Sequence, residues 1–312
     1  MWWNNSVMHS GKIKKIFVSI VLVMAIFLVS CTQTISESED SNVKIVEVPK
    51  YERVPVTISD EMEFAEYSAI KTGTAYLYKQ RERKVILGKF APVVAINAGH
   101  GTDIDPSIKT LSHPDGSPKV TGGTTKEGEV YSYAISKGMT FPNGVKEAEV
   151  TLLLALYLRD ELLDMGYDVL MLREDVDTKL DNIARTVLAN NFANIHISLH
   201  YDSTDTDKGI FYCSTPSSKK YRKMYPVNQT YELNDLLGDT IVAALASQGE
   251  KIYGAGKLPM DLTQMSYTKI PSIDLELGDR ASVHTPDRLK ELASRLATAI
   301  YCIPLESFPP ID

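Results

Sequence analysis

The sequence lacks the features that mark several large classes of protein. Basic residues do not outnumber acidic ones: 33 Lys and Arg stand against 40 Asp and Glu, for a formal net charge of −7. This balance argues against a nucleic-acid-binding protein, which normally carries a basic face. Only three cysteines occur, and none forms a Cys-x-x-Cys pair, so a cysteine-ligated zinc site is not indicated. With 44% hydrophobic residues among 312, the chain still has the balance of an ordinary globular protein.

The apolar run near the N-terminus is too short for a membrane span. Residues 16–28 are apolar except for one serine, whereas a span needs roughly 20 such residues. Three lysines precede the run, so residues 1–30 are predicted to be a secretory signal peptide. The run ends in Leu-Val-Ser-Cys31, which resembles the lipobox of bacterial lipoproteins and implies a diacylglycerol on the Cys31 sulfur. An ordinary signal peptide with an incidental cysteine, or an uncleaved anchor, are the alternatives.

Residues 31–90 are predicted to form a tether and a small accessory segment. Residues 32–42 are rich in Ser, Glu and Asp, a composition that cannot bury a core and favours a flexible linker. The rest of this region carries no chemical motif. It is expected to contain short strands or extended pieces at 43–48, 54–58 and 74–79 and a short helix at 60–70.

From residue 91 onward, apolar runs of strand length alternate with segments of helical periodicity. The expected strands are 93–96, 167–172, 195–199, 209–213 and 272–277. The expected helices are 145–165, 180–193, 233–248 and 286–301. The alternation predicts the α/β class: a single three-layer domain over residues 91–305, with a mostly parallel central sheet flanked by helices. Residues 102–144 form a long segment without periodicity, which is usually functional in a compact domain.

Four polar residues occupy positions where α/β domains build their sites, just beyond the carboxyl ends of strands. His100 and His200 each follow a predicted strand, Glu276 lies near the end of another, and Glu147 opens a helix. Two imidazoles and a carboxylate form a common catalytic zinc set, and a second carboxylate can act as general base. Each residue also has an ordinary structural interpretation. His100 could shape a turn, and His200 could be a core histidine. Glu147 could interact with the helix dipole, and Glu276, near Asp274, could be a structural carboxylate of the strand.

The other histidines are weaker candidates. His196 precedes His200 by four residues on a strand, so the two lie on one face but roughly 13 Å apart, too far to share one ion. We therefore expect His196 to be a core histidine or to support the site from behind. His113 and His284 fall in predicted loops, where they could contact substrate or lie in solvent, and solvent exposure is the expectation for both.

Four motifs in order resemble the zinc N-acetylmuramoyl-L-alanine amidases of the type 3 family, over about residues 92–305. The first is Ala-Ile-Asn-Ala-Gly-His-Gly ending at residue 101, and the second is Glu-Ala-Glu-Val-Thr-Leu at 147–152. The third is an arginine and Ala-Asn at 185–190 leading into Ser-Leu-His ending at residue 200. The last is Pro-Ser-Ile-Asp-Leu-Glu-Leu-Gly at 271–278.

The resemblance implies an enzyme that cuts the amide between N-acetylmuramic acid and L-alanine of peptidoglycan with zinc-activated water. It implies Zn²⁺ ligands at His100, Glu147 and His200 and a catalytic Glu276. Glu147 is preferred to Glu149 by its distance from the leucine that closes the second motif. The chain departs from the family at Asp202, at Gly278-Asp279-Arg280 and in its longer 102–144 segment, which bears on substrate detail rather than on the metal set.

These observations together predict an extracytoplasmic enzyme that is lipid-anchored through Cys31 to the bacterial membrane. Its expected partners are peptidoglycan and that membrane, with no nucleic acid, and an activating protein is left open. Two alternatives are a zinc peptidase acting on the stem peptide and a non-catalytic wall-binding lipoprotein. In an exported compartment, Cys213 and Cys302 could pair or could stay as unpaired thiols.

Overall fold

The computed structural model describes residues 50–82, 85–86, 89–90, 92–103 and 105–304. The predicted signal peptide, Cys31, the tether and the expected strand at 43–48 lie outside these residues. Among the helices that are described, none combines the length and apolar character needed to cross a membrane.

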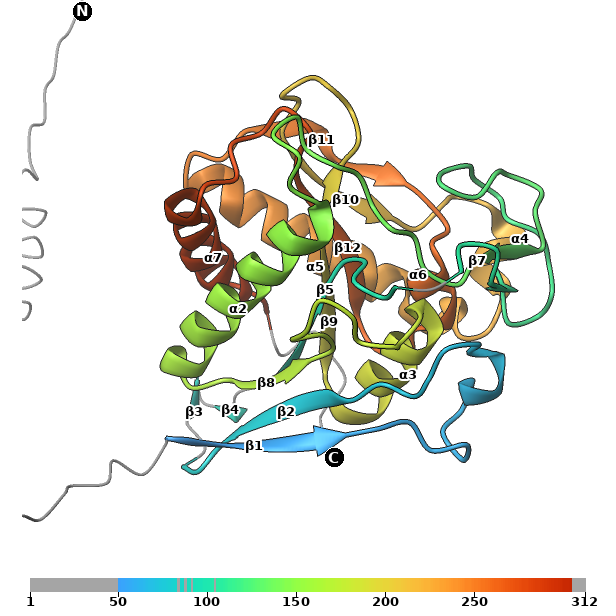
Figure 1. Ribbon diagram of the computed structural model, residues 1–312, viewed down its shortest axis with the longest axis horizontal. Coiled ribbons are helices and arrows are strands. Elements are labelled where there is room, and N and C mark those ends of the chain that lie inside the picture. The colour runs from blue at the N-terminus through green and yellow to red at the C-terminus, as the bar shows by residue number, and fades with distance from the viewer. Residues whose placement is uncertain (1–49, 83–84, 87–88, 91, 104, 305–312) are drawn as a thin grey trace, which may run out of the picture. The chain divides into compact units, whose positions relative to one another are not determined.

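An eight-stranded sheet forms the centre of the fold (Figure 1). Its strands, in spatial order, are β1 (Tyr51–Val56), β2 (Ala75–Gln80), β8 (Asp168–Met171), β5 (Val93–Ala98), β9 (Ile195–Asp202), β12 (Ser272–Asp279), β10 (Ile210–Ser214) and β11 (Ile252–Pro259). The four central strands β8, β5, β9 and β12 run parallel, as do β10 and β11. The pairs β1–β2, β2–β8 and β10–β12 are antiparallel. The predicted mostly parallel sheet is confirmed.

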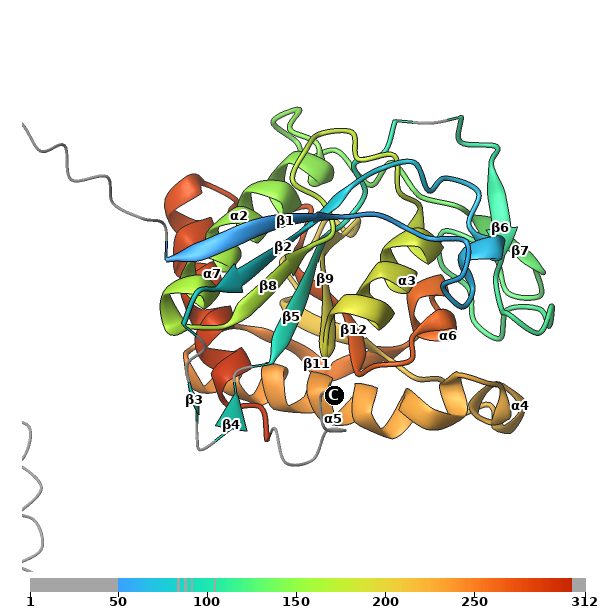
Figure 2. The same ribbon diagram turned by 90° about the horizontal axis from the view of Figure 1, so that it is seen from below.

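Helices cover both faces of this sheet, which gives the predicted three layers (Figures 1 and 2). One face packs against α2 (Glu147–Met165), α5 (Val227–Ser247) and α7 (Pro286–Tyr301), which share the largest hydrophobic cluster with the central strands. The other face packs against α3 (Asn182–Phe192) and α6 (Thr263–Tyr267). The remaining elements are short: η1 (Ala65–Tyr67), α4 (Lys219–Lys223), the pair β3 (Val85–Ile86) and β4 (Lys89–Phe90), and the pair β6 (Lys109–Leu111) and β7 (Tyr131–Tyr133).

Alternation along β9 and β12 separates apolar from polar side chains. Successive residues of a strand point to opposite faces of the sheet, and the apolar residues of both strands join the cluster under α2, α5 and α7. The polar residues therefore face the α3 and α6 side. Parallel pairing aligns them, with Ser198 beside Asp274 and His200 beside Glu276. The register thus gathers the polar groups of two distant segments in one place.

Three expectations about secondary structure need correction. The helix expected at 60–70 is wrong: only the single turn η1 forms, because Phe64 before it adopts φ 72°, which interrupts a right-handed helix. The strand expected to end at residue 199 continues to Asp202, since its pairing with β12 extends beyond the apolar run. The long 102–144 segment contains the small β6–β7 sheet.

The region expected to be a small accessory segment contributes two strands to the central sheet. β1 and β2 extend it at the edge next to β8, and β2 pairs with β8 over Tyr76–Met171, Leu77–Leu170 and Tyr78–Val169. Ala75 and Leu77 of β2 pack in the same apolar cluster as Leu170. Residues 51–80 therefore share a core with the predicted domain.

The ends of two long helices follow the local sequence signals. α2 stops at Gly166, whose φ of 97° is easily reached only by glycine, and the Gly166 N–H caps the carbonyls of the last turn. α7 begins after Thr285, whose side chain accepts a hydrogen bond from the Arg288 N–H, with Pro286 in the first turn.

We predict that Thr285→Ala lowers the free energy of unfolding by about 1 kcal/mol, because the first turn of α7 loses the side chain that caps it. Thr298→Ala is the matched control: Thr298 lies on the exposed side of the same helix, and its loss should change stability by less than about 0.5 kcal/mol. Urea unfolding of both variants measures the difference. Equal effects would contradict the capping role.

Candidate metal centre and active site

His100 stands in the turn after β5, in a backbone conformation rare for a residue with a side chain. Its φ is 64°, in the left-handed region that is seldom used except by glycine and that often occurs at functional sites. Its Nδ1 lies 2.9 Å from the Ser136 carbonyl oxygen. A carbonyl can only accept, so Nδ1 carries the proton. The Nε2 lone pair is thereby left free for a cation.

Glu147 is the first residue of α2 and is buried. Its Oε1 lies 2.9 Å from His100 Nε2 and 3.1 Å from His200 Nδ1. Backbone N–H groups orient the carboxylate: Met139 donates to Oε2 over 2.9 Å and Tyr201 donates to Oε1 over 3.1 Å. Both oxygens are thus fixed by segments that come from outside the helix.

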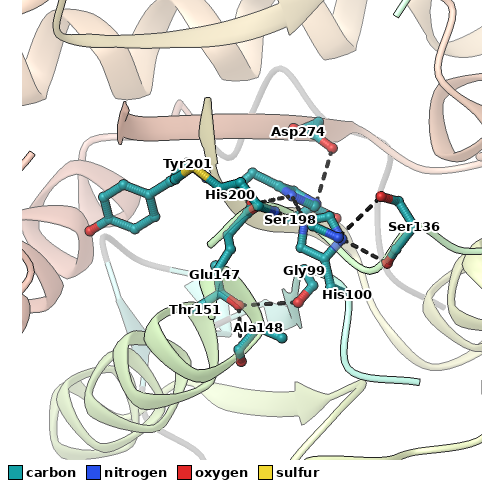
Figure 3. Close-up of polar contacts among 12 residues, drawn as sticks. Gly99, His100, Ser136, Glu147, Ala148, Thr151, Ser198, His200, Tyr201 and Asp274 are labelled. Carbon is teal, nitrogen blue, oxygen red and sulfur yellow. Dashed lines mark hydrogen bonds and ion pairs between the residues drawn. The ribbon is translucent and has the colours of Figure 1, made fainter. Parts of the chain in front are cut away.

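His200 lies within β9 and completes the group (Figure 3). Its Nδ1 is 3.1 Å from His100 Nε2, and the two rings stand edge to face at 4.6 Å between centroids. One ligand atom from each of His100, Glu147 and His200 lies within 4.8 Å of the others. The sequence-predicted metal ligands therefore converge, although they are separated by up to a hundred positions.

Two glycines leave the space that these side chains occupy. A Cβ at Gly99 would come within 2.3 Å of the His200 ring, and a Cβ at Gly138 would come within 2.6 Å of the His100 ring and 2.8 Å of Glu147 Oε2. Contacts this short do not occur between real side chains. Gly99 and Gly138 therefore let the backbone approach the rings closely and hold them in place.

Two fully buried arginines brace the turn that carries His100. Arg185 donates to the carbonyls of Ala98 and His100 over 3.0 and 2.6 Å. Arg173 donates to the carbonyls of Ala98 and Gly99, both over 3.0 Å. Burial lowers their pKa values to about 9 and about 10 respectively, so both stay positively charged at neutral pH. Backbone oxygens, fixed by several donors at once, then have little freedom to move.

The electrostatics of the centre favour positive charge. Burial opposes ionisation of Glu147, but the two histidines hold the pKa of this carboxyl well below its usual range. Burial likewise lowers the pKa of His200, but Asp274 and Glu147 raise it to about 10. In the absence of a metal, the group therefore holds a proton at neutral pH. A site that retains a proton so strongly offers the same negative potential to a metal cation.

Glu276 projects from β12 on the same face as His200 and lines the cavity next to it. Its Oε2 is buried and has no hydrogen-bond partner among the described residues. Burial, together with the neighbouring Asp274, raises its pKa to about 8. Such a carboxyl can take up and give back a proton near neutral pH, as a general base must.

The cavity has a volume of about 590 Å³, and its lining includes three parts of the chain, one of them within residues 258–264. The strand ends and the first turn of α2 contribute His100, Glu147, His200 and Glu276. The opposite side comes from the long segment, including Lys119, residues 122–125 and residues 132–139 except Ala134 and Lys137. The 102–144 segment therefore forms a wall of the site instead of an exposed loop.

Asp261, before α6, anchors that wall. Its buried carboxylate accepts hydrogen bonds from Lys119 Nζ, from His113 Nε2 and from the backbone N–H groups of Val120 and Thr121, over 2.6 to 3.2 Å, and from the Thr121 hydroxyl. The expectation that His113 lies in solvent is wrong, because its side chain is only 1% exposed. Asp261, which lies 148 positions further along the chain, holds the His113 ring through the 3.0 Å contact of Oδ2 with Nε2.

The remaining histidines and cysteines lie apart from the metal centre. His196 is buried with neither ring nitrogen bonded within the described part of the chain, and burial lowers its pKa to about 3, so it is a neutral core residue as expected. His284 is partly exposed, packs on the Phe141 ring at 4.0 Å and pairs with Asn143. Cys213 is a buried thiol and Cys302 an exposed one, and they form no disulfide.

Sequence reasoning missed three contributors to the site. The Ser136 carbonyl could not be foreseen, because backbone acceptors leave no trace in residue type. Asp261 likewise had no motif around it. Asp274 had a detectable signal: it stands two residues before Glu276 on the same strand, so both carboxylates had to face the same side.

Comparison with known proteins decides the family. The profile described as N-acetylmuramoyl-L-alanine amidase matches residues 94–302, about two thirds of the chain. The chain belongs to this amidase family. Its activity is accordingly hydrolysis of the amide between N-acetylmuramic acid and L-alanine in peptidoglycan, outside the cytoplasm. Members of the family are typically metal-dependent, in agreement with the His100–Glu147–His200 group.

Solved structures of amidases share this fold. The N-acetylmuramyl-L-alanine amidase Ami1 of Mycobacterium smegmatis aligns with a TM-score of 0.50 and 20% identity over 67% of this chain and 93% of its own. Ami1 of Mycobacterium abscessus, in its apo form, aligns with a TM-score of 0.51 and 18% identity over 69% of this chain and 97% of its own. A search of curated proteins found no match.

We predict that Asp261→Ala loosens the wall of the amidase cleft, since it leaves the buried Lys119 ammonium without its counter-charge. Hydrogen exchange of the backbone at residues 113–125 should accelerate at least about tenfold. Asp60→Ala removes an exposed ion pair with Lys71 and serves as the control, with exchange in this segment unchanged. Unaltered protection in Asp261→Ala would show that other contacts hold the wall.

Proposed function

We propose that this amidase is a zinc enzyme whose ion is held by His100, Glu147 and His200. The observation that carries the proposal is the convergence of one atom from each residue within 4.8 Å. Two imidazole nitrogens and a carboxylate oxygen are a donor set that catalytic zinc uses, with a position left for water or substrate.

The hydrogen bonds around the centre support this assignment. His100 Nδ1–H donates to the Ser136 carbonyl, which leaves Nε2 as the metal-binding atom. His200 presents Nδ1 toward Glu147 Oε1 at 3.1 Å. Glu147 is ionised, with its pKa lowered by both histidines. Glu147 thus has the ionised state that zinc coordination requires, and the proton held by the metal-free group would be released when zinc binds.

Glu276 is proposed as the general base. When bound, zinc supplies a Lewis acid that polarises the scissile carbonyl and makes a water molecule acidic. The Glu276 carboxylate then accepts a proton from the attacking water and returns it to the departing nitrogen of L-alanine. Its Oε2 supports this role, because it is buried, has no hydrogen-bond partner within the described part of the chain, and belongs to a residue that lines the cavity. The C–N bond breaks as the new C–O bond forms, so one water is consumed per amide cut.

The location of the enzyme is proposed from the N-terminal sequence. Residues 1–30 would be removed as a signal peptide, and Cys31 would carry the lipid that anchors the chain to the membrane. Residues 32–42 would act as a tether between that anchor and the catalytic domain. Peptidoglycan lies within reach of an enzyme placed in this way.

The metal and base assignments predict opposite behaviour for two variants. Glu276→Gln should keep zinc at about one ion per chain but lose about 10²- to 10⁴-fold in turnover, because the proton acceptor is gone. His200→Ala should lose zinc itself, with affinity reduced by at least about tenfold. Elemental analysis and stem-peptide release from purified murein measure the two effects.

His284→Ala is the matched control, because His284 lies outside the metal group, and it should retain both zinc and turnover. Full activity of Glu276→Gln would show that Glu276 is not the general base, and an unchanged zinc content in His200→Ala would show that His200 is not a zinc ligand. Mass analysis of the products fixes the bond that is cut: stem peptides that begin with L-alanine are expected, whereas cuts within the peptide would indicate a peptidase.

Anchoring is tested by Cys31→Ser, which should move the protein from the membrane fraction to the soluble exported fraction, because no acyl chain can be attached. Cys302→Ser, which removes an exposed thiol elsewhere, should leave the distribution unchanged. Retention of Cys31→Ser in the membrane fraction would mean that another part of the chain provides the anchor.

A further inference from the structure

Asp274 places a second buried carboxylate against the metal group, on the far side of His200 from Glu147 (Figure 3). Its Oδ2 lies 3.5 Å from His200 Nε2, and its side chain is 11% exposed. Glu147 Oε1 lies 3.1 Å from the other ring nitrogen, Nδ1. The imidazole is therefore held between two carboxylates, one at each nitrogen.

The surroundings of Asp274 leave few other partners for its charge. Its Oδ1 lies 4.0 Å from the Cys213 thiol, which is only a weak donor. A buried carboxylate without a strong donor is costly, and His200 presents Nε2 to Asp274 Oδ2 at 3.5 Å. This requirement favours the His200 tautomer in which Nε2 carries the proton and Nδ1 carries the lone pair.

The two imidazoles of the centre are then fixed in complementary ways. His100 is protonated at Nδ1 by its contact with the Ser136 carbonyl and presents Nε2. His200 faces Asp274 with Nε2 and presents Nδ1. Gly99 leaves room for the His200 ring on one side, but its backbone does not choose between the ring nitrogens. The choice needs a polar partner such as Asp274.

We propose that Asp274 is a positioning residue that fixes the tautomer and orientation of His200 and so raises the affinity of the centre for zinc. Partners of this kind typically contribute 10- to 100-fold in metal affinity. The role is distinct from that of Glu276, which lies on the same face of β12 but whose Oε2 accepts no hydrogen bond from the residues that the structure describes. The inference rests on the proposed function, since it takes His200 as a zinc ligand.

The first test is zinc affinity, measured on the purified full-length protein by competition with a chromophoric chelator. Asp274→Leu removes the acceptor while keeping an apolar side chain of similar size, and we expect it to weaken zinc binding about 10- to 100-fold. Asp274→Asn keeps an acceptor oxygen without the charge and should lie between Leu and wild type. Glu276→Gln replaces the neighbouring carboxyl with an amide of the same size, leaves Asp274 and His200 in place, and should bind zinc within about threefold of wild type.

The second test reads the tautomer directly and does not depend on activity. In ¹⁵N-histidine-labelled wild type loaded with zinc, the His200 ring should show a proton on Nε2 and metal bound at Nδ1. A ring with zinc at Nε2 would overturn the proposal even if every variant failed to fold. In Asp274→Leu, the Nε2 proton should exchange faster with solvent, because its acceptor is gone.

The outcomes separate this inference from the proposed function. If wild type binds no zinc, or if His200→Ala binds it as well as wild type, the metal assignment itself fails. If wild type binds zinc through His200 but folded Asp274→Leu binds it within about twofold of wild type, only the role of Asp274 fails. Loss of affinity in Asp274→Leu with retention in Glu276→Gln supports it.

Discussion

The shared contact of one Glu147 oxygen with two imidazoles is the constraint on which the site depends. Glu147 Oε1 lies within about 3 Å of His100 Nε2 and His200 Nδ1. For this to happen, the first turn of α2 must lie over the carboxyl ends of β5 and β9. The apolar cluster beneath α2 sets the position of this turn. The backbone N–H groups of Met139 and Tyr201 then orient the Glu147 carboxylate by donating hydrogen bonds to it. Helix packing and ligand geometry are therefore coupled.

Charge is distributed around this contact in a way that suits a cation. Glu147, Asp274 and Glu276 bring three carboxyls to one small region, and their mutual repulsion, added to burial, raises the pKa of Glu276 to about 8. The two buried arginines do not neutralise these carboxyls directly, because they bind backbone oxygens of the turn at residues 98–100. They stiffen the turn and leave the positive charge of the centre to be supplied by a proton or a metal ion.

The sequence predicted the class of fold and the main side chains of the site because both depend on local patterns. Apolar runs defined the central strands, helical periodicity defined α2, and positions at or near predicted strand ends marked His100, His200 and Glu276. The family assignment came from motifs in β5, α2, β9 and β12, and the match over residues 94–302 confirms it. The metal-ligand and catalytic roles stay proposals that the geometry supports.

What the sequence could not provide depends on long-range contact. The helix expected at 60–70 does not form, because Phe64 adopts a left-handed backbone conformation. His113 was expected in solvent because its partner, Asp261, lies 148 positions away in the sequence. The wall built by the 102–144 segment rests on Asp261 in the same way. Residues 31–90 were expected to be a tether and an accessory segment, yet β1 and β2 within them extend the sheet through pairing of β2 with β8, which a one-dimensional pattern does not reveal.

The most direct test of this account is a crystal structure of the zinc-loaded enzyme with diffraction recorded on both sides of the zinc absorption edge. The account predicts one anomalous peak bonded to His100 Nε2, Glu147 and His200 Nδ1 at roughly 2 Å. A peak elsewhere in the molecule, or zinc held without Glu147 or either histidine, would contradict it.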